Sequence, residues 1–597
     1  MRGRASRMMA MDFPADAWYL SFTAKEAGST IAVKATTGAP SLTLYYSTDL
    51  QEWDRLRVGV NTITLGEIGD TVWIKAGSSG NNALAYTDSA YNYFEMTGCI
   101  EAAGNIMSLL NGGRATTTIT ATRCFEKLFY GCTSMTKPPE LPATTLTEYC
   151  YASMFEGCTS LTRGPELVAT TVPSNAYDRI FYGCSALAEI CVRCNEWTDS
   201  FTDWMNGVAS SGNFRCSVHL GMNPYIDRGA SKCPTDWTVL NFKEDWVLCF
   251  TAEEANSTVK LNYNKYQTTN ETVDSGSIFT KPDPQIKMAY SLDGVLWQNL
   301  ATGSSIELEN EGDKIFVLSG LEEQTLAGHY FGYTDKLFTN TPYTPEPDTP
   351  IPSVPNTTNA NYYSFAMTGK IAASGDVSSV TGKTKGNMPD GAVETYLTYR
   401  SLGGTNRIYY KYGRYFIGHF ALFQGCTALT KAPEFSATTL TPFCYASMFE
   451  GCTGLKEMPK LPAIEWAKGS TWGSLGSNSG CYNRMFAGCA GLEKASDLPA
   501  NASDGFGYDS MFEGCYSLKE SPAIPSTAKY VTGMFKNCIA LEKIKVAFTA
   551  WPESTTGWVG GVADGGVFEC PAALGTNATI TRGVDACPEE WTVVNAA

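Results

Sequence analysis

The chain has 597 residues, of which 43% are apolar and 17% are charged, and its formal net charge at pH 7 is −16. This composition supplies several hydrophobic cores and excludes a disordered chain, while length alone predicts about four domains. An acidic chain without a run of Lys and Arg is not expected to bind nucleic acid, because the phosphate backbone would repel it.

The N-terminal tail, residues 1–11, is a poor secretory signal. Its apolar stretch covers only residues 8–11, whereas a signal core needs about 7–15 apolar residues, and the polar or rigid residues Asp12 and Pro14 prevent its extension. No run approaches the ~18 apolar residues of a membrane span, so we expect no membrane insertion. Abundant Gly, Thr, Ser, Tyr and Trp are typical of exterior β-proteins. Either a signal has been trimmed, or the protein leaves its host without one, as a phage structural protein released by lysis does.

Two related β-sandwiches are predicted, at residues 12–90 and 243–338. Their segments alternate apolar and polar residues between Gly/Asp turns, which indicates half-buried antiparallel strands. The matching segments are 18–27 with 246–255, 46–53 with 290–297, and 65–72 with 308–315. By pattern, both sandwiches resemble immunoglobulin-like spacer modules. Residues 339–361, rich in Pro and Thr, are typical of a semi-stiff linker.

One octet, with the pattern apolar-Phe-x-Gly/Asn-Cys-x-x-Leu/Met, recurs eight times, and four of the six steps within its two blocks are 26 residues. Such a period with fixed Leu, Phe and Cys positions indicates leucine-rich repeats. One repeat cannot bury its own apolar face, so stacking should place the octet phenylalanines in a core ladder. We expect brief helical turns at the octets and short strands between them. The octet phenylalanines are Phe129, Phe155, Phe181, Phe423, Phe449, Phe486, Phe512 and Phe535.

The octets predict two leucine-rich-repeat solenoids with caps, at residues 91–242 and 362–597. Segments 96–104 and 367–375 are alike and are interpreted as opening caps, because terminal repeats must turn one face to water. Each block closes on two tryptophans, which are Trp204 and Trp237 in the first and Trp558 and Trp591 in the second. The predicted fold is mainly β with short helical turns, in two tandem modules that each join a sandwich to a solenoid.

These octets resemble BspA-type leucine-rich repeats, known from bacterial surface proteins and from proteins of gut Bacteroidetes and their phages. The resemblance covers about residues 123–190 and 415–545, plus the caps. It implies attachment to a host matrix, a glycan or another protein. It brings no catalytic residues with it, and a likeness of fold does not by itself fix a function.

Most of the twenty cysteines are interpreted as small apolar residues of the ladder, where nearly parallel side chains would suit disulfides poorly. The closing caps differ, because each keeps two cysteines 17 residues apart. These disulfide candidates are Cys216 with Cys233 and Cys570 with Cys587. Cys191 and Cys194 have redox or zinc-knuckle spacing, but without a second Cys or His pair a strand is favoured.

The sequence predicts no catalytic residue, metal ligand or cofactor. His219, His329 and His419 are expected at the surface or in turns, and His419 aligns with Phe125 of the first half. No nucleophile elbow, zinc-protease motif, phosphate loop or calcium loop occurs. A glycosidase carboxylate pair stays open, because two carboxylates meet only in space.

The third octet position varies, and in a solenoid such positions decorate the outer face. A row of this kind can contact a partner, and its tyrosines can stack on sugar rings; an ordinary solvated face is the alternative. The candidate binding residues are Tyr130, Glu156, Tyr182, Gln424 and Glu450.

The sequence thus favours a non-enzymatic structural or attachment protein. The first hypothesis is a phage virion surface component, either a fibre, a head decoration or a host-contacting appendage. It would bind other virion proteins or a host-surface glycan or protein, with homo-oligomerisation open. The second is a bacterial cell-surface adhesin, and the third is a set of binding modules of a carbohydrate-active enzyme.

Overall fold

The structure is a computed structural model of a nearly all-β protein, about 3% helical, with a β-solenoid of about 13 turns between residues 166 and 595. It divides into two compact units, Met1–Phe242 and Lys243–Ala597, which are described separately below. The described residues are 18–111, 116–264, 286–339, 360–386, 388–389, 393–401, 406–466, 480–499 and 507–596. The predicted tail 1–11 lies outside them.

The first unit begins with two sheets that pack face to face. Their orders are β10-β9-β1-β6-β3-β4 and β5-β2-β8-β7. Phe22 on β1 and Phe94 on β8 bring one ring from each sheet into contact, at 5.0 Å between centroids. The strands are β1 (Leu20–Ala24), β2 (Ser29–Ala35), β3 (Leu44–Ser47), β4 (Asp54–Leu56), β5 (Thr62–Leu65), β6 (Thr71–Ala76), β7 (Ala85–Thr87), β8 (Ala90–Thr97), β9 (Ile100–Ala103) and β10 (Met135–Lys137).

The solenoid of the first unit grows directly out of these sheets. Strand β9 pairs antiparallel with β1 on one side and parallel with β10, from the first coil, on the other. Segment 96–104, expected to be an opening cap, is therefore also part of the sandwich, and one hydrophobic core runs through both. The unit ends in the parallel sheet β11 (Glu166–Leu167), β12 (Glu189–Val192), β13 (Asn213–Cys216) and β14 (Thr238–Asn241), with two short helices, α1 (Ser108–Asn111) and η2 (Asp199–Phe201).

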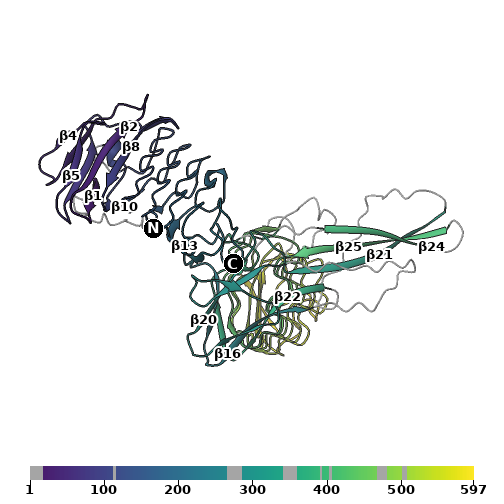
Figure 1. Ribbon diagram of the computed structural model, residues 1–597. Coiled ribbons are helices and arrows are strands. Elements are labelled where there is room, and N and C mark those ends of the chain that lie inside the picture. Colours follow the sequence, from purple (N-terminus) through teal and green to yellow (C-terminus); the bar gives the residue numbers. More distant parts are fainter. Residues whose placement is uncertain are drawn as a thin grey trace. The chain divides into compact units, whose positions relative to one another are not determined.

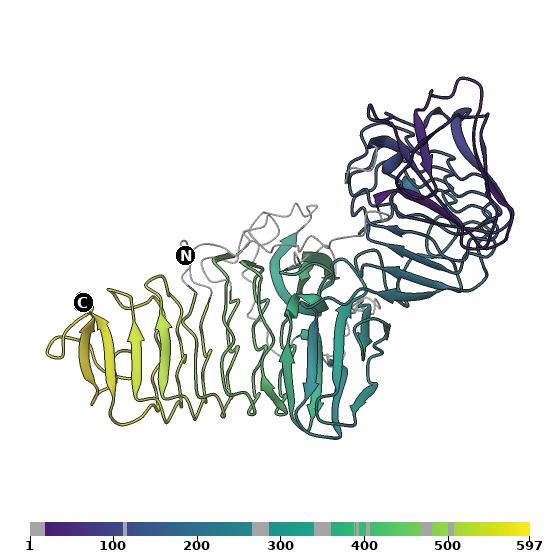
Figure 2. The same ribbon diagram turned by 90° about the vertical axis from the view of Figure 1, so that its left-hand side faces the viewer.

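The second unit repeats this strand order, with β18-β17-β20-β15-β23-β26 in one sheet and β19-β16-β22-β21 in the other. Figure 2 shows its coils as successive rungs between these sheets and the C-terminus. Its elements are β15 (Leu248–Ala252), β16 (Ser257–Asn264), β17 (Met288–Ser291), β18 (Gln298–Asn299), β19 (Ser305–Leu308), β20 (Lys314–Ser319), β21 (Ala327–Thr339), β22 (Ala360–Thr368), β23 (Ile371–Ser374), η3 (Val377–Val380), β26 (Leu429–Lys431), β27 (Thr439–Leu440), β28 (Glu465–Trp466), β29 (Glu520–Ile524), β30 (Lys543–Val546), β31 (Val567–Pro571) and β32 (Thr592–Ala596).

A three-stranded ribbon distinguishes the second unit (Figure 1). Strands β24 (Val393–Ser401) and β25 (Asn406–Ile417) form an antiparallel pair, and β25 also pairs with the long strand β21. The predicted linker 339–361 falls mainly outside the described residues. Its two ends continue into β21 and β22, which pair with each other in one sheet. The linker therefore connects neighbouring strands.

The octets do not form helical turns, which corrects that prediction. They form runs of tight turns in which a left-handed residue recurs every fourth position, as at Lys127 (φ 58°) and Gly131 (φ 69°), and an α-helix cannot contain such residues. Successive N–H groups alternate between two kinds of hydrogen bond. One kind lies within the coil, as Tyr130 N–H donates to Lys127 O, and the other reaches the next coil, as Phe129 N–H donates to Met154 O at 2.9 Å. Backbone bonding between coils thus replaces helical bonding.

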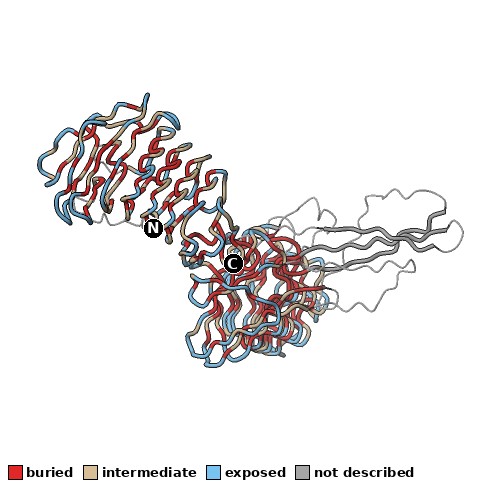
Figure 3. The backbone as a smooth tube through the Cα atoms, in the orientation of Figure 1, coloured by how far each residue is buried: buried red, intermediate tan, exposed pale blue. Residues whose placement is uncertain are grey.

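The octet phenylalanines lie inside the coils and are fully buried. Within each unit their rings stack in register, as Phe129 on Phe155 at 5.5 Å and Phe423 on Phe449 at 5.4 Å. Figure 3 shows the buried residues following the inner side of the coils. Each ladder begins on a sandwich phenylalanine and ends on a buried cap tryptophan. The four end residues are Phe94 and Trp204 in the first unit and Phe365 and Trp558 in the second.

A second aromatic ladder lies four residues before the first in each coil. In the first unit it runs from Phe125 to Tyr151, with centroids 5.8 Å apart, and on to Tyr177. In the second unit His419 takes the place of Phe125 and contacts Tyr445 at 5.5 Å. His419 lies in a bend of the chain, but the expectation of a surface position is wrong: its side chain is fully buried because it begins a core ladder.

The octet cysteines form a hydrogen-bonded ladder. Each thiol donates to the carbonyl oxygen of the ladder phenylalanine in the preceding layer, as Cys158 does to Phe129 O at 3.1 Å and Cys452 to Phe423 O at 3.0 Å. Burial raises the pKa of these thiols, for example that of Cys489 to about 12. The cysteines therefore stay protonated and satisfy backbone oxygens inside the core.

The cap cysteines are thiols, which corrects the expectation of two disulfides. Their sulfurs point at nearby carbonyl oxygens: Cys216 at Gly221 O (3.5 Å) and Cys233 at Pro234 O (3.6 Å). Cys570 and Cys587 repeat this arrangement in the second unit. Both caps therefore keep the same two thiol–carbonyl contacts.

Candidate binding groove

A groove of about 490 Å³ opens on the outer face of the first solenoid. Three successive coils line it, through residues 123–130, 149–156 and 178–179, together with Asp88 from the turn between β7 and β8. This first-unit groove contains two of the candidate binding residues, Tyr130 and Glu156. Its volume falls within the range of roughly 300–1,000 Å³ that small-molecule sites occupy.

The turn geometry of the coils places the polar residues of the groove. Arg123, Lys127 and Arg179 have left-handed backbone conformations, with φ of 55°, 58° and 51°. Tyr149 and Ser153 occupy the same kind of position, with φ of 56° and 52°. Along the chain, these residues alternate with the buried ladder residues. The rigid core therefore fixes the backbone positions from which the groove side chains extend. Sites on such a framework need little reorganisation when a ligand binds.

Two arginine–carboxylate pairs hold the walls of the groove. Arg123 Nη1 donates to both carboxylate oxygens of Glu126, at 2.9 and 2.8 Å, and Glu126 is only 3% exposed. Burial raises the pKa of Glu126, and the Arg123 guanidinium opposes this shift. Arg179 binds Glu156 through Nε and Nη2, at 3.2 and 2.7 Å. Fork-shaped pairing of this kind fixes both side chains in place.

Tyrosines surround these pairs. The guanidinium of Arg123 lies 4.0 Å from the ring centre of Tyr149, and that of Arg179 lies 3.9 Å from Tyr182. Tyr182 is thereby a support for Arg179, and it does not line the groove. Among the described residues, no cation or second ring covers Tyr130, which is 43% exposed. Its ring is the open aromatic surface of the groove.

Asp178 provides an acceptor without a partner. Its Oδ1 is buried and has no hydrogen bond to any described residue. Burial raises the pKa of Asp178, while neighbouring Arg179 lowers it. A buried acceptor is costly unless something donates to it. Because Oδ1 is closed off from solvent, a ligand in the groove can reach the Asp178 carboxylate only through its other oxygen.

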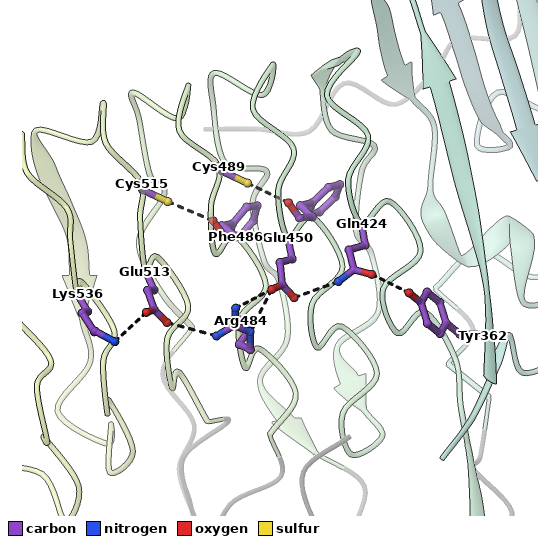
Figure 4. A network of polar contacts seen from close by, with 10 residues as sticks. Tyr362, Gln424, Glu450, Arg484, Phe486, Cys489, Glu513, Cys515 and Lys536 are labelled. Carbon is purple, nitrogen blue, oxygen red and sulfur yellow. Dashed lines mark hydrogen bonds and ion pairs between the residues drawn. The ribbon is translucent and has the colours of Figure 1, made fainter. Parts of the chain in front are cut away.

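The same face of the second unit carries a closed polar network instead (Figure 4). Tyr362 Oη donates to Gln424 Oε1 at 2.8 Å, and Gln424 Nε2 donates to Glu450 at 3.3 Å. Arg484 binds both Glu450 and Glu513, at 2.6 and 3.3 Å. Lys536 adds an ion pair to Glu513. The candidate residues Gln424 and Glu450 thus contact each other and their neighbours along the coils.

Apolar residues replace four of the groove residues in the second unit, while the Glu156–Arg179 pair recurs there as Glu450–Arg484. Aligning Phe129 with Phe423 places Ile417, Phe420, Ala421 and Phe443 opposite Arg123, Glu126, Lys127 and Tyr149. The coil hydrogen bonds agree with this alignment, since Lys127 N–H donates to Ala152 O and Ala421 N–H to Ala446 O. The four replacements belong to a buried apolar cluster that includes Ala327 of β21. The coil fold therefore does not require the polar set.

Sequence reasoning found the row that includes Tyr130 and Glu156 but missed the other charged groove residues. Their signal was available: Lys127, Ser153 and Arg179 each stand two residues before an octet phenylalanine and alternate with apolar neighbours. Asp88 gave no signal, because only the fold brings it to the coils. Among the described residues, no three His, Cys, Asp or Glu side chains gather as a metal site requires.

No protein-family model, curated protein or solved structure matches this chain. Within the described part of the chain, no helix combines the length and apolarity that crossing a bilayer requires.

Proposed function

We propose that this chain is a non-enzymatic attachment protein that holds its ligand on the outer face of the first solenoid. The observation that carries the proposal is the polar groove of the first solenoid, because four of its residues, Arg123, Glu126, Lys127 and Tyr149, have buried apolar counterparts in the second unit. A binding site requires polar side chains held on a rigid framework, and the fold itself does not need these four. The resemblance of the octets to BspA-type leucine-rich repeats, and of the sandwiches to immunoglobulin-like spacers, supports the same role.

We favour the surface of a phage virion as the location of this protein, with a bacterial cell surface as the alternative. The thiol ladder supports the first, because each octet sulfur must keep its proton to donate to a phenylalanine carbonyl. A reducing cytoplasm, where virion proteins assemble, keeps thiols in that form, whereas exported proteins fold in oxidising surroundings.

The test of attachment is to incubate the purified, labelled full chain with host bacteria and with mucin. We expect saturable binding without any change in the glycan. Turnover of the glycan would favour the carbohydrate-active enzyme, and absence of binding to either surface would contradict attachment. Imaging intact particles with an antibody against the chain separates the carriers, because only a virion component labels the particles.

A further inference from the structure

The first-unit groove is lined by more acidic than basic side chains. Arg123 and Arg179 are each paired with a glutamate, and Lys127 Nζ donates to the Asp88 carbonyl oxygen. Asp88 and Asp178 add negative charge. Four carboxylates thus face three cations, Arg123, Lys127 and Arg179, and this excess of negative charge disfavours an anionic ligand.

The groove nevertheless offers hydrogen-bonding groups in fixed positions. The paired guanidinium groups keep further N–H donors, since each arginine has five. Asp178 lines the groove and offers an acceptor through the carboxylate oxygen that is not buried. Adjacent donors and acceptors suit a ligand whose groups both donate and accept hydrogen bonds, as hydroxyl groups do.

One open aromatic ring completes the set. Tyr130 is 43% exposed, and it lines the same groove as Asp178. A sugar ring combines an apolar face of C–H groups with hydroxyl groups around its edge, so it matches a tyrosine face beside polar walls. A protein partner is less suited, because a stable protein interface needs roughly 800 Å² on each side with an apolar centre.

We infer that the first-unit groove binds a neutral saccharide, with one sugar ring on Tyr130 and hydroxyl groups bound to Asp178 and to the two arginine–glutamate pairs. This inference rests on the proposed attachment function and specifies its ligand. It assigns no such site to the second unit, where Gln424 replaces Tyr130 within a network that satisfies its own members.

The test is titration of the full-length chain with short oligosaccharides, followed by calorimetry and by saturation-transfer NMR. The probes are neutral oligomers of glucose, galactose, mannose and N-acetylglucosamine, with sialylated and sulfated oligomers as the acidic set. The variants are Tyr130→Ala and Asp178→Asn. The matched control is Tyr516→Ala, which removes a tyrosine of similar exposure (51%) from the second unit.

We expect a neutral oligomer to bind, each groove variant to lower its affinity about tenfold, and the control to leave it unchanged. Preference for acidic oligomers would overturn the inference, as would neutral binding that both groove variants leave intact. Failure of every oligomer to bind would overturn it too. If no oligomer binds but the protein still binds cells or mucin, the attachment proposal stands and only the saccharide inference fails. If the protein binds neither cells nor mucin, both the inference and the attachment proposal are refuted.

Discussion

The two solenoids share a backbone but use the same outer face in opposite ways. In the first unit, Arg123, Glu126 and Lys127 line an open groove, whereas their counterparts Ile417, Phe420 and Ala421 are buried in an apolar cluster. In the second unit the strand that corresponds to β7 is lengthened into β21, which pairs with β25 in the ribbon. The inner ladders specify the coil, and the outer positions are free to become a site or a contact surface.

The largest expected effect tests whether both units depend equally on the inner ladder. Phe155→Ala and Phe449→Ala each remove a fully buried stacked ring and should each lower the free energy of unfolding by about 3–5 kcal/mol. Hydrogen exchange of peptides from each unit, during denaturant titration, measures the two losses separately. A cost near zero in either unit would show that its phenylalanines do not form the core, and Tyr516→Ala is the exposed control.

The second prediction concerns the ladder position that carries His419, a titratable residue, in the second unit and Phe125 in the first. Burial lowers the pKa of His419 to about 4 from its ordinary 6.5, against the opposing effects of Asp376 and the Val377 carbonyl. The unfolded state therefore takes up the proton first as the pH falls. The stability of the second unit is full above pH 6.5 and declines by about 3 kcal/mol towards pH 4.

His419→Phe, which copies Phe125 of the first unit, should remove this part of the pH dependence. The measurement is the difference in unfolding free energy between pH 7 and pH 4 for the variant and the parent chain. An equal decline in both would assign the pH dependence to another group. The first unit supplies the internal reference, because phenylalanine does not titrate.

The third prediction is that the thiol ladder contributes alike in both units. Cys158→Ala and Cys452→Ala each remove a buried sulfur and its bond to a phenylalanine carbonyl, and each should cost about 1–2 kcal/mol. Cys99→Ala, at a half-buried position outside the ladder, should cost less than about 0.5 kcal/mol. Equal costs at all three positions would mean that the ladder bonds add nothing.

The smallest effects lie in the polar network of the second unit. Arg484 bridges two glutamates and is half-exposed, so Arg484→Ala should cost about 1 kcal/mol, while Lys536→Ala at the exposed end should cost under about 0.5 kcal/mol. Both losses should shrink at high salt, because salt screens exposed charges. Losses that salt does not change would indicate packing rather than charge.

Periodicity was sufficient to predict the solenoid and the mainly β architecture, because octet residues repeat at a nearly constant step. It did not predict turns in place of helical segments, since left-handed positions such as Lys127 and Arg179 carry residues that also occur in helices. The second aromatic ladder was visible as Phe125, Tyr151 and Tyr177, which share the octet period, but these residues lack the fixed Gly and Cys that mark the octet.

The groove was predictable only in part. Tyr130 and Glu156 belong to the varying row, so the row indicated them correctly as outward positions. Tyr130 is open, whereas Gln424 is bound to Tyr362. This contact of Gln424 depends on strand β22, which is far away in sequence. Asp88 and Asp178 line one groove only because the fold brings a β-turn and a coil to the same face, and this leaves no local sequence pattern.

The difference in coil number between the solenoids has a consequence for how the molecule changes length. The first unit carries three octets and the second carries five. Each added coil extends the stack by one strand spacing, about 4.8 Å. Unequal recombination between similar repeats can thus lengthen or shorten the stack by whole coils, because each added coil repeats the same interior contacts. The length of a solenoid can therefore change without altering the residues on its outer face.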